Sequence, residues 1–111
     1  MERAVLILVT AGGRDDAERI GESLVVERLA ACCSVVPTVH SFYFSEDQLQ
    51  RDHEALLIIK TLESQASAVQ EFVRTHHTYE TPEIIQVPIE GGSSPYLNWL
   101  EQQVAKPRSG Q

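Results

Sequence analysis

The chain has few cysteines, few aromatic side chains and no long apolar segment. Its 111 residues include 2 cysteines, and the aromatic residues make up 6%. Cys32 and Cys33 are adjacent, and adjacent cysteines bridge only with strain, so no disulfide framework and a reducing, cytoplasmic location are expected. The longest apolar run, residues 4–9, is too short to span a membrane. It also starts too early, without a sizeable basic region before it, to be a signal peptide.

The chain also lacks a basic stripe and the common catalytic motifs. Its formal net charge is -7, so we expect no nucleic-acid surface. No Ser-His-Asp order, phosphate-binding loop or zinc-protease motif occurs, so an enzyme is not expected. The apolar fraction of 42% is that of a soluble globular protein. We expect one domain over residues 1–105 and a disordered tail over 106–111, where apolar residues are scarce.

Hydrophobic periodicity predicts strands and helices in the order β-α-β-β-α-β, followed by a last helix. Asp15, with Glu18 three residues later, is predicted to cap the first helix, and Ser94 to cap the last. Pro37 and Pro88 predict edge or bulge positions in their strands. The predicted elements cover residues 3–10, 16–30, 32–44, 49–61, 64–76 and 84–89, and a helix that follows Ser94.

This order predicts an α+β fold of the ferredoxin-like βαββαβ type, an antiparallel sheet with helices on one face plus a C-terminal helix. The two arms of its central hairpin are each about a dozen residues long, so each would reach about 40 Å at roughly 3.3 Å per residue. That is longer than a domain of this size needs. The protruding arms would expose unpaired backbone groups, so we expect an oligomer built by strand pairing between subunits.

The densest group of chemically active side chains lies in residues 76–85, where the second helix should end. His76 and His77 are candidate ligands for a divalent cation, and nitrogen ligands of this kind bind Cu(II) most tightly. Adjacent residues of a helix point about 100° apart, so sharing one ion requires a frayed helix end or ligands from another subunit. The alternative is that both imidazoles only interact with the negative end of the helix dipole.

The remaining histidines and the cysteines carry weaker signals. His40 and His53 lie in the hairpin and are expected to face solvent or a partner chain. Cys32 and Cys33 alternate between the faces of a strand, so one belongs to the core and the other faces outward or an interface. Cys32 is a possible thiol ligand, but a role as a small hydrophobic residue is favoured.

Four segments together resemble the CutA family of divalent-ion tolerance proteins. They are residues 27–32 (Glu-Arg-Leu-Ala-Ala-Cys), the pair Lys60 and Thr61, residues 77–84 (His-Thr-Tyr-Glu-Thr-Pro-Glu-Ile) and residues 96–99 (Tyr-Leu-Asn-Trp). The resemblance spans nearly the whole chain. It implies a homotrimer of ferredoxin-like subunits with an architecture similar to that of the PII signalling proteins, and it supplies the oligomer that the long hairpin requires.

The resemblance also implies a function. It implies a cytoplasmic, non-catalytic trimer that binds Cu²⁺ or another divalent cation and serves metal tolerance, with His76 and His77 in contact with the ion. In the copper-associated relative the paired histidines act with a cysteine of the first strand, and the matching position here is Val9, so a thiolate is absent. Other departures from the family pattern are Ser45, Asp47 and Thr78.

The resemblance places a second group of residues near the clefts between subunits. The group consists of Lys60, Tyr79, Glu83 and Trp99. A cation beside aromatic and carboxylate groups could hold a small polar ligand, which defines a rival function as a PII-like signalling or ligand-binding trimer. The alternative is a Lys–Glu pair with a hydrogen-bonded tyrosine that only holds the trimer together.

Overall fold

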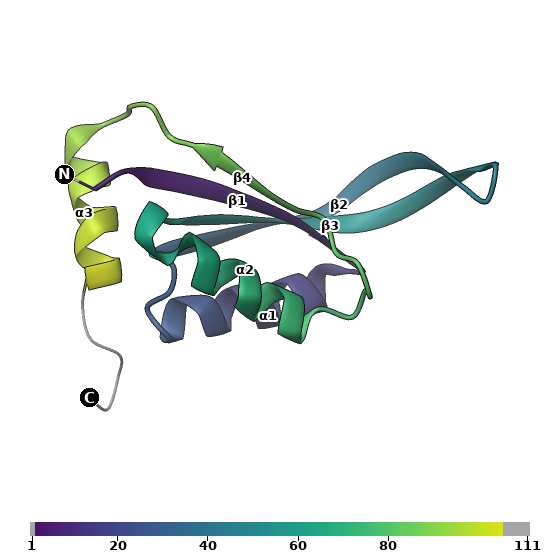
Figure 1. The fold of residues 1–111 in the computed structure, drawn as a ribbon, viewed down its shortest axis with the longest axis horizontal. Helices are drawn as coiled ribbons and strands as arrows, with labels where there is room; N and C mark the ends of the chain where they lie inside the picture. The colour runs from purple at the N-terminus through teal and green to yellow at the C-terminus, as the bar shows by residue number, and fades with distance from the viewer. Residues whose placement is uncertain (1, 106–111) are drawn as a thin grey trace.

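One four-stranded antiparallel sheet forms the centre of the protein, and two helices cover one of its faces (Figure 1). The structure is a computed structural model that describes residues 2–105, so the predicted tail lies outside the described residues. The strand order is β2-β3-β1-β4, which confirms the ferredoxin-like α+β fold. The elements are β1 (Ala4–Ala11), α1 (Arg14–Val26), β2 (Cys32–Ser45), β3 (Gln48–Leu62), a 3-10 turn η1 (Glu63–Gln65), α2 (Ala66–His76), β4 (Ile84–Pro88) and α3 (Ser94–Ala105).

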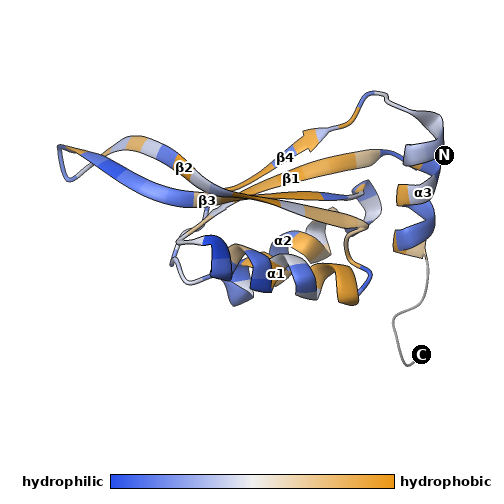
Figure 2. Ribbon diagram, turned by 180° about the vertical axis from the view of Figure 1, so that it is seen from behind, coloured by the Kyte–Doolittle hydropathy of each residue, from blue (hydrophilic) through white to orange (hydrophobic). Residues whose placement is uncertain are grey.

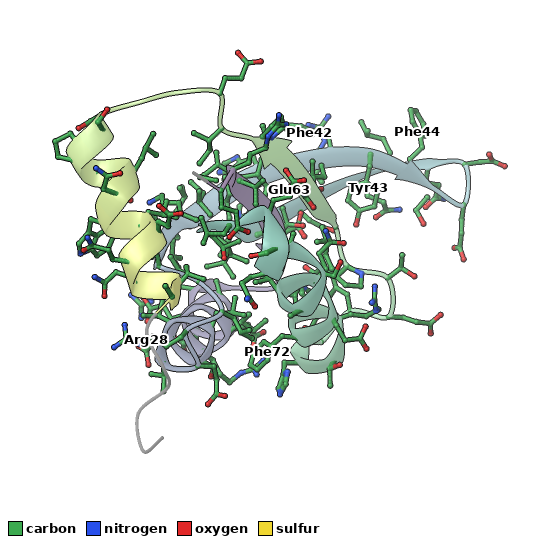
Figure 3. All side chains as sticks on the ribbon, turned by 60° about the vertical axis from the view of Figure 1, so that its left-hand side comes forward. Arg28, Phe42, Tyr43, Phe44, Glu63 and Phe72 are labelled. Carbon is green, nitrogen blue, oxygen red and sulfur yellow. The ribbon has the colours of Figure 1, made fainter. Side chains whose placement is uncertain are left out.

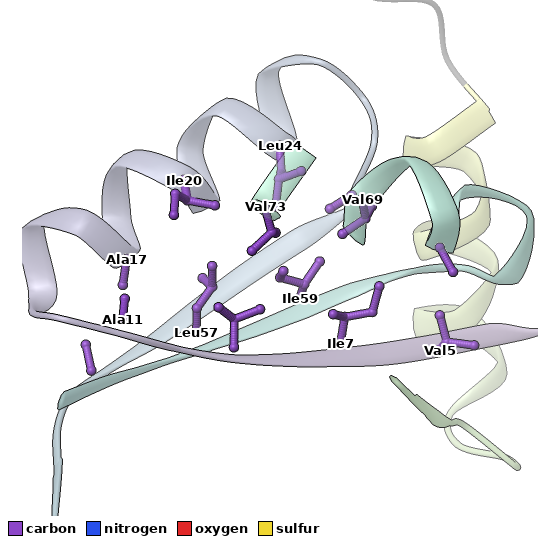
Figure 4. Close-up of a cluster of buried hydrophobic side chains, with 14 residues drawn as sticks. Val5, Ile7, Ala11, Ala17, Ile20, Leu24, Leu57, Ile59, Val69 and Val73 are labelled. Atoms are coloured by element: carbon purple, nitrogen blue, oxygen red, sulfur yellow. The ribbon is translucent and has the colours of Figure 1, made fainter. Parts of the chain in front are cut away.

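The main core lies between the sheet and helices α1 and α2 (Figure 4). In β1, the alternate residues Val5, Ile7 and Val9 point towards the helices and are at most 1% exposed. Each fully buried side chain of this kind stabilises the fold by about 1.5–3 kcal/mol. The chains that meet them come from β3, α1 and α2, and they include Leu57, Ile59, Ile20, Leu24, Val69 and Val73.

A smaller cluster forms where α3 covers one end of the opposite sheet face. Leu100 and Val104 of α3 pack against Leu62 and Ala31, with Ala4 beside them. The rest of that face has no helix over it in the described residues. We call it the open face, and its central members are Leu6, Leu8, Leu56 and Ile58.

Helix α1 ends four residues earlier than periodicity predicts. Arg28 adopts a left-handed conformation with φ of 60°. The N–H of Arg28 donates to the carbonyl of Val25, and the N–H of Leu29 donates to that of Leu24. This is a Schellman ending, in which the apolar residue beyond the helix still packs on the core. Leu29 therefore continues the apolar spacing without being helical.

The predicted helix caps are wrong at two positions. Helix α1 begins at Arg14 after the extended Gly13, with no side-chain cap, so Asp15 lies inside the first turn instead of preceding it. There its carboxylate interacts favourably with the helix dipole. Helix α3 begins at Ser94, and the N–H of Leu97 donates to the carbonyl of Ser93. Its hydrogen bonds therefore start one residue before the predicted cap.

The β2–β3 hairpin extends well beyond the rest of the sheet, as the sequence predicts (Figure 1). Its turn consists of Glu46 and Asp47, both with positive φ, which is the pattern of a type I′ turn. Aspartate tolerates this conformation, so Asp47 fits the turn. Strand β1 pairs with β3 only from position 55 onward, so residues 48–54 pair with β2 alone. We call residues 39–54 the arm.

Both strand prolines lie where the sequence predicts. The pairing of β2 with β3 shifts between Val36 and Val39, a bulge that contains Pro37. Pro88 is the last residue of β4, and both β2 and β4 are edge strands. No helix in residues 2–105 is long and apolar enough to cross a membrane.

Replacing Gly21 by alanine tests how tightly α1 packs on the sheet. An added Cβ would lie 3.1 Å from Cδ1 of Leu57 and 3.2 Å from Cβ of Cys33. We expect overpacking of about 1–3 kcal/mol, which outweighs the 0.5–1 kcal/mol or so that alanine gains over glycine within a helix. Chemical denaturation measures the difference. The control is Gly91→Ala, because nothing lies within 4 Å of its added Cβ. A Gly21→Ala protein at least as stable as wild type would contradict this packing.

Candidate functional site

His76 is the last residue of α2 and has one ring nitrogen without a protein partner among residues 2–105. Its Nδ1 donates to the carbonyl of Phe72 at 2.8 Å, and its ring stacks on Phe72 with centroids 4.0 Å apart. The side chain is exposed. Its Nε2 is therefore free to ligate a cation.

His77 has no free nitrogen. Its Nε2 donates to the carbonyl of Thr10 at 2.7 Å, and its Nδ1 accepts from the N–H of Tyr79 at 3.0 Å. The residue has extended backbone angles and caps α2. These two bonds hold the segment after α2 against the end of β1. In this arrangement both ring nitrogens of His77 are hydrogen-bonded to backbone groups and neither can ligate a metal.

The structure therefore does not bring His76 and His77 together as two ligands of one ion. Within residues 2–105 there is no group of three or more histidine, cysteine, aspartate or glutamate side chains placed to hold a metal. Val9 is fully buried in the main core and contributes no ligand. A complete coordination sphere around His76 would need ligands from another chain or from water.

Tyr79 and Glu83 share a cavity of about 720 Å³ beside the base of the arm. The Tyr79 hydroxyl donates to Oε2 of Glu54 at 2.9 Å, and Tyr43 donates to Asp52 in the same cavity. The lining contains three carboxylates and, among the described residues, no lysine or arginine. Its charge suits a cationic or neutral ligand better than an anion.

The tyrosines of this cavity are held in their neutral form. Desolvation, and then the hydrogen bond to Glu54 and the charge of that carboxylate, raise the pKa of Tyr79 from 10.0 to about 12. The hydrogen bond to Asp52 is the first cause that raises the pKa of Tyr43. Glu54, with 9% of its surface exposed, depends on the Tyr79 hydroxyl as its donor.

The other residues of the predicted cleft lie elsewhere in the subunit. The Lys60 ammonium is on the open face and donates to Ser34 Oγ at 2.8 Å and towards Cys32 Sγ at 3.7 Å. Trp99 is on α3, where its ring lies 5.5 Å from that of Tyr96. A single subunit thus brings Tyr79 and Glu83 together in one cavity, whereas Lys60 lies beside Cys32 and Trp99 lies on α3. The four residues of the predicted cleft do not meet within one subunit.

The cysteines face opposite sides of β2, as predicted. Cys33 packs against the main core, and burial raises the pKa of its thiol to about 12. Cys32 pairs with Lys60 across the strands and lies on the open face. Both are free thiols.

Two of the four matching segments meet around Thr61. Its hydroxyl donates to the carbonyl of Leu29 at 2.6 Å, and the N–H of Ala31 donates to the carbonyl of Lys60 at 2.9 Å. Thr61 is fully buried. The Lys-Thr pair therefore fixes how the chain leaves α1 and enters β2, which is a structural role for this motif.

Sequence reasoning missed Glu54 and Asp52 as cavity residues, and it missed the pairing of His40 with His53. The carboxylates occupy alternate positions of one strand, which places both on one face. His40 and His53 lie at equal distances from the two turn residues Glu46 and Asp47. Once that turn is recognised, the register follows.

Comparison with known proteins agrees with the resemblance. A family model described as CutA1 divalent ion tolerance protein matches residues 5–103. Protein CutA 1, chloroplastic, of Oryza sativa subsp. japonica is 42% identical over 98 residues, which are 88% of this chain and 55% of that protein. The divalent-cation tolerance protein CutA of Citrobacter koseri is 36% identical over 87% of this chain and 84% of its own length. The chain thus spans about half the length of the plant relative.

Solved structures show the same fold. The crystal structure of CutA1 from Oryza sativa superposes with a TM-score of 0.89 and 40% identity, over 92% of this chain and 94% of that one. The structure titled periplasmic divalent cation tolerance protein CutA from Archaeoglobus fulgidus superposes with a TM-score of 0.87 and 33% identity, over 91% of this chain and 98% of that one.

Fold and sequence together define a ferredoxin-like protein of the divalent ion tolerance class. The chain belongs to the CutA1 family.

Tyr79→Phe tests the cavity by its pH dependence. The pKa of Tyr79 is raised to about 12 in the folded protein, whereas an unfolded tyrosine ionises near pH 10. Between about pH 10 and pH 12 the folded state therefore keeps a proton that the unfolded state loses. The contribution of the Tyr79–Glu54 hydrogen bond to the stability of the fold is complete below about pH 10 and is lost as the pH rises towards 12. We expect Tyr79→Phe to remove the latest step in the tyrosinate absorbance titration. Tyr96→Phe is the control, and an unchanged titration in Tyr79→Phe would contradict the assignment.

Proposed function

We propose that this protein is a homotrimeric, non-catalytic binder of divalent cations that acts in metal tolerance, with Cu²⁺ as the first ion to test. The observation that carries the proposal is the free Nε2 of the exposed His76, in a family named for divalent ion tolerance. Imidazole nitrogen prefers Cu(II) among the divalent first-row metals. The net charge of -7 adds a general attraction for cations.

The trimer supplies what a single subunit lacks. His76 offers one nitrogen, and the described residues of one subunit contain no complete set of ligands. A neighbouring subunit, or water, would have to provide the remaining positions. The proposed location is the cytoplasm, which suits the two free thiols, although the Archaeoglobus relative is titled periplasmic.

The open face supports assembly. Its strands are strongly apolar through the centre of the sheet (Figure 2). Leu6, Leu8, Leu56 and Ile58 keep part of their surface exposed there, and Ile85 of β4 is 48% exposed. A sheet face of this composition is stable in water when another apolar surface covers it.

The arm supports assembly as well. Along residues 48–54, one edge of β3 has no partner strand in the described residues. Phe44, 77% exposed, and Tyr43 project from opposite sides of the hairpin (Figure 3). An unpaired edge with apolar side chains is a template for strand pairing, and in the proposed trimer a neighbouring subunit provides the pairing strand.

A second candidate function is a PII-like trimer that binds a small ligand between subunits. The observation in its favour is Lys60, which has no carboxylate partner among the described residues and is partly buried on the open face. A partly buried ammonium is stabilised by an acidic group, either from a neighbouring subunit or from a ligand. In a trimer, the acidic cavity of Tyr79 in a neighbouring subunit would be one source of such a group.

The oligomer is tested by sedimentation at micromolar concentration, where we expect the mass of three chains. Ile58→Lys places a charge in the middle of the open face, and we expect it to shift the mass to one chain while circular dichroism keeps the folded spectrum. The control is Val26→Lys, because Val26 is already 61% exposed on α1. A wild-type mass near one chain would mean that neither the open face nor the arm makes a subunit contact.

Copper binding is tested by calorimetry with Cu²⁺ on the wild type and on His76→Asn. We expect His76→Asn to lose one set of binding sites, with affinity at that set reduced by about tenfold or more, or about 1.4 kcal/mol. His77 is left in place because its nitrogens hold backbone groups. The control is Thr75→Asn, an exposed neighbour in the same turn. Equal stoichiometry and affinity in His76→Asn would remove His76 from the proposal.

A further inference from the structure

His40 of β2 and His53 of β3 are direct partners across the arm. Their rings are stacked, with centroids 4.4 Å apart and planes 24° from parallel. Both side chains are exposed. The two-residue turn at Glu46 and Asp47 sets this register, so the pairing is a property of the hairpin itself.

The pair lies on the same side of the sheet as α1 and α2. Side chains of β3 alternate without interruption, so His53 shares a face with Ala55 and Leu57 of the main core. The bulge sets two residues of β2 against one of β3 and brings His40 to that side too. His53 borders a cavity of about 530 Å³ at the start of α1. The open face, which the trimer would cover, is on the other side.

Neither imidazole has a hydrogen-bond partner among residues 2–105. They differ in this from His76, which uses one nitrogen, and from His77, which uses both. The chain has 4 histidines, so these are the two whose nitrogens are all available to a ligand.

We propose that His40 and His53 form a second transition-metal site, a pair of imidazole ligands carried by each subunit's own hairpin. This inference rests on the proposed cation-binding function and adds to it a site that needs no second chain. It differs from the His76 site in element and in ligand number.

The chemistry of the pair suits a first-row metal. Each nitrogen–metal bond would be about 2.0–2.1 Å long, so the two nitrogens must come within about 3 Å of each other. Cross-strand neighbours have Cβ atoms only about 4.5–5.5 Å apart, and exposed rings can turn from stacking to a shared ion by side-chain rotation. Two neutral imidazoles favour Cu(II) over Zn(II) and do not suit Mg²⁺ or Ca²⁺. Water completes the coordination.

Charges of both signs lie near the histidine pair. Asp15 and Asp16 line the cavity that His53 borders, together with Arg14. Arg14 and Arg19 form ion pairs with these carboxylates. On the arm itself the next cation is Arg51, and its guanidinium is held over the ring of Phe42 at 5.3 Å.

A bound ion would connect the two strands of the arm. Residues 48–54 of β3 pair with β2 alone, so this part of the sheet has less strand support than residues 55–62. A metal shared by His40 and His53 would act as a cross-strand clip. It would stiffen the segment that we propose for strand pairing between subunits, and so would link ion binding to assembly.

The test uses His76→Asn as the parent protein, so that His40 and His53 are the remaining histidines with free ring nitrogens. Phenylalanine replaces each in turn, because His40→Phe and His53→Phe keep a stacked ring and remove the ligand. Zn²⁺, which is redox-inert, is titrated by calorimetry. The Cu²⁺ complex is examined by electron paramagnetic resonance for hyperfine splitting from two nitrogens. Hydrogen exchange reports on residues 39–54 with and without Zn²⁺.

We expect the parent to bind one Zn²⁺ per chain and to show two nitrogens on Cu²⁺. Each single replacement should weaken Zn²⁺ binding by about tenfold or more, or about 1.4 kcal/mol, and the double replacement should weaken it little further, because chelation needs both rings. Zn²⁺ should slow hydrogen exchange of residues 39–54 in the parent protein, and not in the His40→Phe and His53→Phe variants. Sedimentation and circular dichroism verify that every variant keeps its fold and assembly.

The other outcomes overturn the inference in distinguishable ways. Unchanged binding in His40→Phe and His53→Phe would show that the ions bind elsewhere. Partial, additive losses would show two independent nitrogens and no shared ion. If wild type binds Cu²⁺ and the His76→Asn parent does not, the His76 site stands and this one fails. If wild type binds neither ion, both this inference and the proposed cation binding fail.

Discussion

The whole molecule depends on how β3 is paired along its length. From position 55 to 62 it lies between β1 and β2, and this part carries the core that α1 and α2 cover. From 48 to 54 it pairs with β2 alone, which creates the arm. Where the two parts join, Glu54 turns its carboxylate to Tyr79 and the acidic cavity begins. One strand with two kinds of neighbourhood thus contributes to the core, to the cavity and to the surface that we propose for assembly.

The four histidines show how the backbone assigns chemical roles to one side-chain type. His77 holds two backbone groups and acts as a structural residue. Within residues 2–105, His76 keeps one ring nitrogen without a partner at a helix end, whereas His40 and His53 keep both of theirs on an exposed strand pair. Adjacent residues at a helix end diverge, and residues far apart in sequence converge across a hairpin. Adjacency in sequence therefore does not by itself bring two imidazoles together.

Much of the fold could be predicted because its signals are local. Alternating apolar residues identify β1 and β3, and Pro37 and Pro88 mark the bulge and the strand edge where they occur. The errors fall at helix ends, where competing hydrogen bonds decide. Arg28 ends α1 in a left-handed conformation that its side chain does not signal, and Gly13 takes the position expected of Asp15. The site was harder to predict, because Lys60 and Tyr79 act through partners from other strands.

The sequence by itself determined the element order, the ferredoxin-like class and the unusual length of the hairpin, because these follow from periodicity and turn residues within short windows. The motif segments also determined the family. Only the tertiary structure decided which polar atoms stay free. The carbonyl of Thr10, distant in sequence, accepts the hydrogen bond of His77 Nε2. The register set by Glu46 and Asp47 brings the ring of His40 onto that of His53. A histidine nitrogen can ligate a metal only if no backbone group uses it as a hydrogen-bond partner. Identifying such nitrogens requires the complete set of tertiary contacts.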